Sequence, residues 1–187
     1  NSHFIEKCQH NPAITVYQAD PLIMTVDGVF SPQQCQEFID FSHQFDYEVA
    51  PITINSKEGQ TELRIDIRNN QRVIYDDVAF AERIYTQVKA FLPEDLFEWR
   101  VDGLNERFRF YLYEDGQTFK PHFDGNYEVS DWHSSQLTLL IYLSEDFVGG
   151  ETKFFNQTRH VPVFSIQPKM GQILIFQHRQ LHSGAPV

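Results

Sequence analysis

The spacing of apolar residues changes part-way along the chain. Between residues 31 and 92 they recur at intervals of three and four, which is the spacing of one face of a helix. From Arg107 onward they alternate with polar residues or form short apolar runs bounded by Gly and Pro, a pattern typical of strands. We therefore expect two helices in the first half and a set of strands in the second.

The first helix has a clear predicted start. Ser31 suits the N-cap position, Pro32 suits the first helical position, and Gln34 can complete a capping box. Its expected apolar stripe consists of Cys35, Phe38, Ile39 and Phe45. The second helix is expected to begin near Asp76 and Asp77 and to end before Pro93. Its expected inner face consists of Ala81, Ile84, Tyr85, Val88 and Phe91.

The strand-like half contains five expected strands, at residues 107–113, 137–143, 152–155, 161–166 and 172–177. In the first of them the apolar face is formed by Phe108, Phe110 and Leu112, whereas Arg107, Arg109, Tyr111 and Tyr113 form the other face. Helices followed by many short strands predict a mostly β protein with supporting helices (α+β), built as a β-sandwich or jelly roll. We expect one domain over residues 1–187, with helical support at about 31–92 and the jelly-roll core at about 100–187.

Charge narrows the range of partners. The chain has 15 Lys and Arg against 26 Asp and Glu, which gives a formal net charge of −11. Such a protein repels phosphate backbones, so we expect no nucleic-acid partner and favour a peptide or small molecule. No apolar run is long enough to span a membrane, and Cys8 and Cys35 fit no zinc-site spacing. A cytoplasmic protein without a membrane partner is the expectation.

The candidate chemistry centres on His122, Asp124 and His182. Residues i and i+2 of a strand point to the same side, so His122 and Asp124 can bind one metal ion together. Two imidazoles and one carboxylate form the facial triad of non-haem Fe(II) sites, which leaves open positions on the ion. Alone, an H-x-D pattern is more often a surface turn. His178 competes with His182, because His178 and His182 on a helix would resemble half of a zinc site, but the preceding residues 173–176 are strand-like.

Further motifs give these residues a context. They are residues 119–125 around the H-x-D pair, residues 139–144 leading into the GGET of 149–152, and the HSGAPV of 182–187. In this order they resemble the Fe(II)- and 2-oxoglutarate-dependent dioxygenases, specifically the prolyl 4-hydroxylase-like branch, from about residue 108 to 187. Residues 68–72 and 103–107 also look like a bacterial-type subgroup of that branch.

The resemblance implies a double-stranded β-helix with iron at its mouth. It implies His122, Asp124 and His182 as metal ligands, and Tyr113, Thr138 and Tyr142 as contacts of 2-oxoglutarate. Fe(II), 2-oxoglutarate and O₂ are the implied cofactors, with ascorbate as the reductant. The carboxylate of Asp124 favours hydroxylation over halogenation, since halogenating relatives leave that position to chloride. Relatives bind the distal carboxylate of 2-oxoglutarate with a Lys or Arg that we expect beyond Val187, and Lys153, Arg107 and Arg109 are the nearest alternatives in sequence.

The implied activity is hydroxylation of an unactivated C–H bond, in a prolyl residue of a protein or in a small amino-acid-like molecule. The alternative is a non-catalytic jelly-roll module that binds a partner or senses iron or 2-oxoglutarate. A nucleic-acid demethylase of the same superfamily is disfavoured by the acidic charge. Residues 52–59 and 125–135 are expected to form the entrance, and residues 68–72 are expected to be a solvated loop unless they contact the substrate.

Overall fold

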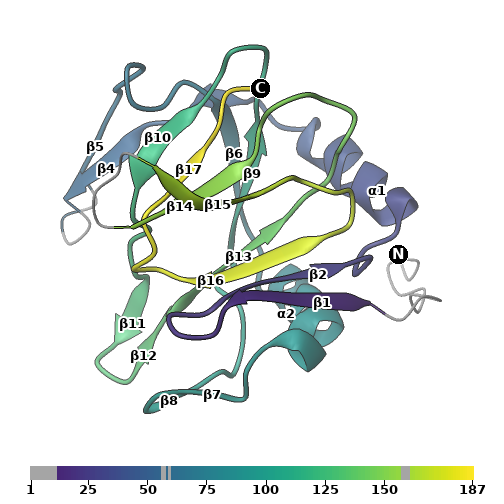
Figure 1. Ribbon diagram of the computed structural model, residues 1–187, viewed down its shortest axis with the longest axis vertical. Helices are drawn as coiled ribbons and strands as arrows, with labels where there is room; N and C mark the ends of the chain where they lie inside the picture. The colour runs from purple at the N-terminus through teal and green to yellow at the C-terminus, as the bar shows by residue number, and fades with distance from the viewer. Residues whose placement is uncertain (1–11, 56–57, 59, 157–160) are drawn as a thin grey trace.

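Two antiparallel four-stranded sheets form the centre of the protein (Figure 1). A computed structural model describes residues 12–55, 58, 60–156 and 161–187. The first sheet has the order β1-β2-β16-β13. Its strands are β1 (Ala13–Gln18), β2 (Ile23–Asp27), β16 (Ile173–Gln177) and β13 (Leu137–Ile141). The second sheet has the order β10-β17-β14-β15. Its strands are β10 (Phe119–His122), β17 (His182–Gly184), β14 (Thr152–Phe155) and β15 (Pro162–Ile166).

Smaller strands extend this core. A three-stranded sheet has the order β3-β6-β9, in which the apolar residues of β9 are more buried than the alternating polar ones, as predicted. Its strands are β3 (Glu48–Val49), β6 (Gln71–Asp76) and β9 (Arg107–Leu112). Three two-stranded hairpins lie outside the main sheets. They are β4–β5 (Ile52–Asn55, Gln60–Glu62), β7–β8 (Asp95–Leu96, Trp99–Arg100) and β11–β12 (Glu128–Ser130, His133–Ser134).

Both predicted helices are present. The helix α1 (Pro32–Ser42) begins with the expected capping box: the amide of Gln34 donates to Ser31 Oγ at 3.2 Å, and the amide of Ser31 donates to Gln34 Oε1 at 3.0 Å. The helix α2 (Val78–Val88) begins at the N-cap Asp77 and continues into a 3₁₀ turn, η1 (Lys89–Phe91). The predicted apolar stripe is wrong at one position, because Phe45 lies beyond the end of α1 and is 38% exposed.

Replacing Ser31 with Ala should destabilise the protein by about 1 kcal/mol, because an N-cap hydroxyl satisfies an otherwise unpaired helical amide. Urea unfolding measures this difference. Ser144→Ala is the matched control, since Ser144 is exposed and outside any helix or strand, and it should change stability by less than about 0.5 kcal/mol. Equal effects of the two substitutions would contradict the capping role of Ser31.

The strand β16 separates two apolar clusters. Ile173 and Ile175 belong to the cluster that includes residues of both helices, such as Phe38 and Ile84. Alternate residues, Leu174 and Phe176, belong to a second cluster with Ile23, Phe154 and Ile166. One face of the sheet therefore packs against the helices, and the other packs against the second sheet, as expected for a jelly roll supported by helices.

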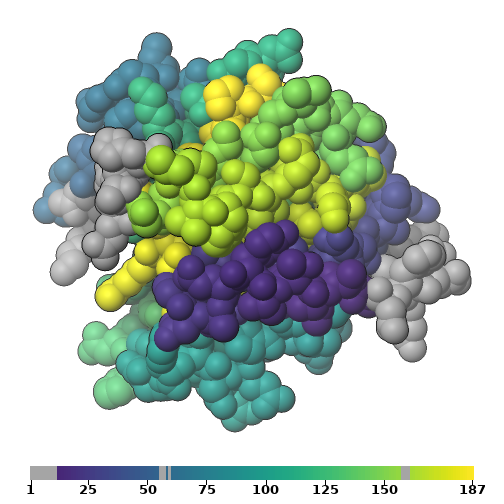
Figure 2. Space-filling view, viewed as in Figure 1, coloured from purple at the N-terminus to yellow at the C-terminus, as the bar shows by residue number. Residues whose placement is uncertain are grey.

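The strand-rich core extends beyond the predicted boundary at about residue 100. The strands β1 and β2 belong to the first sheet, and β6 pairs with β9 along its whole length. The strand β1 runs across the front of the molecule in Figure 2. Its residues Ile14 and Val16 are more than half exposed. Within the described residues, no helix is long and apolar enough to cross a membrane. The predicted α+β jelly-roll class is confirmed.

Candidate metal centre

Three side chains that are distant in sequence converge at the edge of the second sheet. His122 and His182 are direct partners in the antiparallel pairing of β10 with β17, which lie side by side in Figure 1. Asp124 follows β10 by two residues. One ligand atom from each of the three lies within 4.8 Å of the others, and the described residues contain no other such group of His, Cys, Asp or Glu. The structure thus brings together the three residues that the H-x-D pattern and the distal His predicted.

The two imidazoles are oriented in the same way. The Nδ1 atom of His122 lies 2.9 Å from the carbonyl oxygen of Lys120, and that of His182 lies 2.9 Å from the carbonyl oxygen of Gln180. A carbonyl only accepts hydrogen bonds, so Nδ1 carries the proton in each neutral ring. Each Nε2 lone pair is therefore free, and the two Nε2 atoms lie 3.6 and 3.7 Å from oxygens of Asp124. This is the arrangement found in metal-binding histidines.

The Asp124 carboxylate is held in its ionised form. Burial acts to raise its pKa, but the imidazoles of His122 and His182, when they carry a second proton, and the hydroxyl of Thr138 outweigh that effect and lower the pKa well below the usual range. The Thr138 hydroxyl donates a hydrogen bond of 2.6 Å to Asp124 Oδ2. At neutral pH the centre therefore offers a fixed negative charge.

His182 is the most enclosed of the three. Its ring centre lies 4.6 Å from that of Phe176 and 6.0 Å from that of Phe154. Both phenylalanines belong to the second apolar cluster, between the two sheets. Burial lowers the pKa of His182 to about 4, although the Asp124 charge acts in the opposite direction. At neutral pH its imidazole is uncharged, which is the form that binds metals.

Thr138 lies beside the candidate metal ligands, because its hydroxyl donates to and orients the Asp124 carboxylate. Its contact with 2-oxoglutarate stays a prediction. Thr138→Val keeps the shape of the side chain but removes this donor, and we expect Fe(II) affinity to fall about 10- to 100-fold. Fe(II) titration under argon measures the change. Thr25→Val, a buried residue of β2, is the matched control; equal affinity in the Thr138 variant and the wild type would contradict this role.

Tyr113 and Tyr142 are two largely enclosed phenols. Burial raises the pKa of Tyr113 to about 12, with the charge of Arg68 acting in the opposite direction, and burial also raises the pKa of Tyr142. The Tyr142 hydroxyl lies 2.7 Å from Thr152 Oγ1. Both phenols stay protonated at neutral pH and can donate hydrogen bonds to an anion. Their contact with 2-oxoglutarate stays a prediction.

His178 is not part of a helical metal site. It follows β16 in a turn, and its Nδ1 atom lies 2.9 Å from Asn126 Oδ1, so the pair connects this turn to the segment after Asp124. This position agrees with a role beside the ligands rather than among them. Residues 68–72 differ from expectation: Arg68 and Asn70 are buried and not in a solvated loop.

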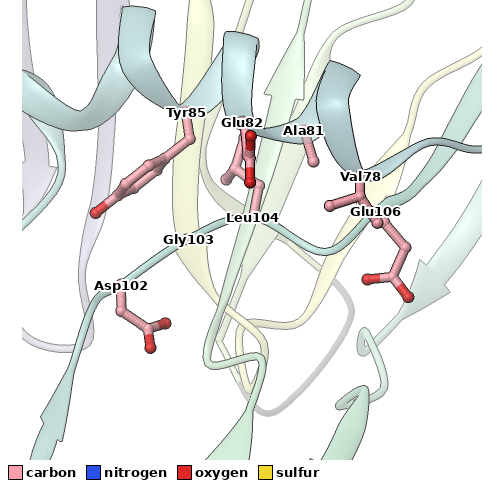
Figure 3. Close-up of a pocket in the computed structure, with 8 residues that line it drawn as sticks. All are labelled: Val78, Ala81, Glu82, Tyr85, Asp102, Gly103, Leu104 and Glu106. Atoms are coloured by element: carbon pink, nitrogen blue, oxygen red, sulfur yellow. The ribbon is translucent and has the colours of Figure 1, made fainter.

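A separate pocket lies between α2 and residues 102–106 (Figure 3). Its volume is about 200 Å³. Val78, Ala81 and Leu104 contribute apolar surface, and Glu82, Asp102 and Glu106 contribute acidic groups. It contains none of the three converging residues, so it is not the metal centre.

Comparison with known proteins agrees with the geometry. Residues 108–187 match the model of the 2OG-Fe(II) oxygenase superfamily, a segment that contains all three converging residues. This part of the chain is therefore similar to the 2OG-Fe(II) oxygenase superfamily. Members of this superfamily use Fe(II), 2-oxoglutarate and O₂. The chain is also similar to a protein named for the expected prolyl 4-hydroxylase-like branch: it is 32% identical over 97 residues to "Probable prolyl 4-hydroxylase 11" of Arabidopsis thaliana. That match covers 51% of this chain and 32% of the plant protein, so the chain spans about a third of its relative's length.

Solved structures show the same fold. A prolyl-4-hydroxylase from Pseudomonas putida superposes with a TM-score of 0.60 at 17% identity, and the match covers 96% of this chain and 87% of that one. An oxidoreductase of the 2OG-Fe(II) oxygenase family from Burkholderia pseudomallei gives a TM-score of 0.54 at 14% identity, with 88% and 78% covered. The fold of this chain is therefore shared over most of each pair of chains.

Proposed function

We propose that this protein is an Fe(II)- and 2-oxoglutarate-dependent dioxygenase that hydroxylates an unactivated C–H bond. The observation that carries the proposal is the convergence of His122, Asp124 and His182, whose ligand atoms lie within 4.8 Å of one another. Two neutral imidazoles and one carboxylate are the donor set of the facial triad, so these residues fit Fe(II).

The chain's own residues define what the centre can do. His122, Asp124 and His182 would hold the ion on one face, and Thr138 would fix the carboxylate. Bound iron supplies the activation of O₂, coupled to decarboxylation of 2-oxoglutarate, so that O₂, 2-oxoglutarate and the C–H compound become succinate, CO₂ and the alcohol. Two neutral ligands and one anionic ligand leave a divalent ion with a net positive charge, which favours a dicarboxylate co-substrate. The apolar cluster against His182 excludes water from one side.

The substrate proposal is a prolyl residue of a protein or a small amino-acid-like molecule. It is supported by the name of the plant relative and by the acidic net charge, which disfavours nucleic acid. The hairpin β11–β12 directly follows Asp124 and exposes large apolar side chains, including Trp132 at 90% and Val129 at 58%. Exposed aromatic and aliphatic groups beside a reaction centre favour a peptide partner. We propose that the protein acts in the cytoplasm.

The test is release of CO₂ from carboxyl-labelled 2-oxoglutarate. The purified protein is incubated with Fe(II), O₂ and ascorbate, together with proline-containing peptides or with free amino acids. We expect Fe(II)-dependent release that increases with one of these substrate sets, and a product heavier by one oxygen atom by mass spectrometry. Tight binding of 2-oxoglutarate with no stimulated release in any set would favour a binding or sensing module instead.

A further inference from the structure

Arg68 is a buried cation close to the metal centre. It is 6% exposed, and among the described residues it is the only Lys or Arg in the buried class. The described residues provide no carboxylate within ion-pair distance of it. A buried guanidinium without an anionic partner is costly, and such groups are rare in folded proteins unless something else satisfies them.

The contacts of Arg68 satisfy only part of its side chain. Its Nε donates a hydrogen bond of 2.8 Å to Asn70 Oδ1. Its Cζ atom lies 4.5 Å from the ring centre of Tyr111 and 4.3 Å from that of Phe119, so aromatic rings cover the guanidinium plane. Its Nη2 atom is buried and has no hydrogen-bond partner. Rings cannot replace the in-plane acceptor that an N–H group requires, so Nη2 still lacks one.

One aromatic ring connects Arg68 to the candidate ligands. The Phe119 ring that contacts the guanidinium also stacks on the His122 ring, with centres 3.5 Å apart and planes 15° apart. The backbones of Arg68 and Phe119 form an antiparallel bridge, which fixes the cation beside β10. The charge of Arg68 also reaches the enclosed Tyr113. Arg68 therefore belongs to the surroundings of the metal centre.

Two of the three other cations that the sequence suggested, Arg107 and Lys153, are already paired. Arg107 donates two hydrogen bonds, of 2.8 and 2.7 Å, to the carboxylate of Asp76. Lys153 lies 3.8 Å from a carboxylate oxygen of Glu151. These two alternatives from the sequence are thus neutralised by neighbouring acids, whereas Arg68 is not.

We propose that Arg68 is a carboxylate-binding residue of this site: its unpaired Nη2 receives an oxygen of an acid bound at the metal centre. The acid is either the distal carboxylate of 2-oxoglutarate or the carboxylate of an amino-acid-like substrate. The proposal rests on the proposed function, because both acids would be held at the same triad. Nη2 is enclosed, so a covering side chain has to shift when the acid enters. Asn70 and the two rings keep the guanidinium in place for this contact.

The experiment compares wild type with Arg68→Met and with the control Arg72→Met. Arg72 lies on the neighbouring strand β6 and is paired with Glu48 at 3.0 Å. Each protein is loaded with Fe(II) under argon and titrated with 2-oxoglutarate and with 2-oxobutyrate, which has the same chelating end but no distal carboxylate. The visible charge-transfer band reports binding. A second arm, at saturating 2-oxoglutarate, titrates L-proline and L-prolinamide and follows the change in that band.

If Arg68 binds the distal carboxylate, Arg68→Met weakens 2-oxoglutarate about 10- to 100-fold and leaves 2-oxobutyrate unchanged, the loss expected for a hydrogen bond to a charged group. If it binds the substrate, 2-oxoglutarate affinity is unchanged and the binding of L-proline, but not of its amide, depends on Arg68. Arg72→Met should behave as wild type in both arms. No Arg68-dependent loss in either arm overturns the proposal.

Two controls keep the result decisive. An unchanged 2-oxobutyrate band shows that Arg68→Met is folded and keeps its metal centre. If that variant does not fold, Arg68→Lys replaces it, because a compact ammonium keeps the charge but loses the planar fork, and a partial loss of acid affinity is expected. A wild-type protein without a band for either oxo acid would contradict the proposed function itself. A wild-type band with no effect of Arg68 would contradict only this proposal.

Discussion

Asp124→Ala should abolish Fe(II)-dependent binding of 2-oxoglutarate while leaving the fold intact. The substitution removes the only anionic ligand of the three and leaves two neutral imidazoles. Loss of an outer hydrogen-bond partner of a ligand costs about 10- to 100-fold in metal affinity, so loss of a ligand should cost more than about 100-fold. Metal content after dialysis against Fe(II), measured by atomic absorption, follows the change. The fold should persist because Asp124 belongs to neither of the two apolar clusters.

Asp131→Ala is the matched control for this substitution. Asp131 is an exposed aspartate between β11 and β12, seven positions further along the chain, and it lies outside the converging group. Its variant should bind Fe(II) as the wild type does. Full metal occupancy and activity in Asp124→Ala would remove Asp124 from the ligand set, and a reduced occupancy in both variants would point to a general effect of charge.

Gly171→Ala should destabilise the protein by roughly 3 kcal/mol or more. Gly171 has a φ of 77°, in the left-handed region, and a Cβ placed there would overlap the carbonyl oxygen of Phe30. The carbonyl of Gly171 also accepts hydrogen bonds from the amides of Val29 and Phe30, each at 3.0 Å, and its amide donates to the carbonyl of Tyr142 at 2.8 Å. This glycine joins the turn before α1 to the end of β13. Backbone atoms on both sides cannot move without breaking these bonds.

Gly116→Ala separates the two causes of the expected loss. Gly116 has nearly the same φ, 78°, but no atom lies within 4 Å of the position that a Cβ would occupy. The free energy of unfolding of this variant should fall only by the cost of placing an alanine in the left-handed conformation, about 1 to 2 kcal/mol. Urea unfolding of both variants gives the comparison. Equal losses would mean that the contact with Phe30 contributes nothing.

The features that could be predicted from sequence are those set by residues close together along the chain. The capping box depends on Ser31 and on Gln34, three residues later, and the alternation of Arg107–Leu112 depends on the period of a single strand. The H-x-D pair is equally local. The distal His182 could be included only because its flanking residues resemble a known motif, since nothing in the spacing shows that β17 pairs with β10.

The features that were missed depend on distant pairings. Burial of Arg68 results from rings on two other segments, Tyr111 and Phe119, so the composition of residues 68–72 alone predicts a solvated loop. The contribution of β2 to the first sheet follows from its pairing with β16, about 150 positions away. The resemblance implied a co-substrate role for Thr138. Its hydrogen bond to Asp124 could not be predicted, because it depends on how two segments meet.

The most direct test of the iron centre is an anaerobic titration of the wild-type protein with Fe(II) and then with 2-oxoglutarate. It requires no knowledge of the substrate, because the visible metal-to-ligand charge-transfer band arises when the oxo acid chelates the iron. We predict a band that saturates at one 2-oxoglutarate per protein. The absence of any band at saturating Fe(II) and 2-oxoglutarate, in protein shown to be folded, would contradict the assignment of His122, Asp124 and His182 as an iron centre.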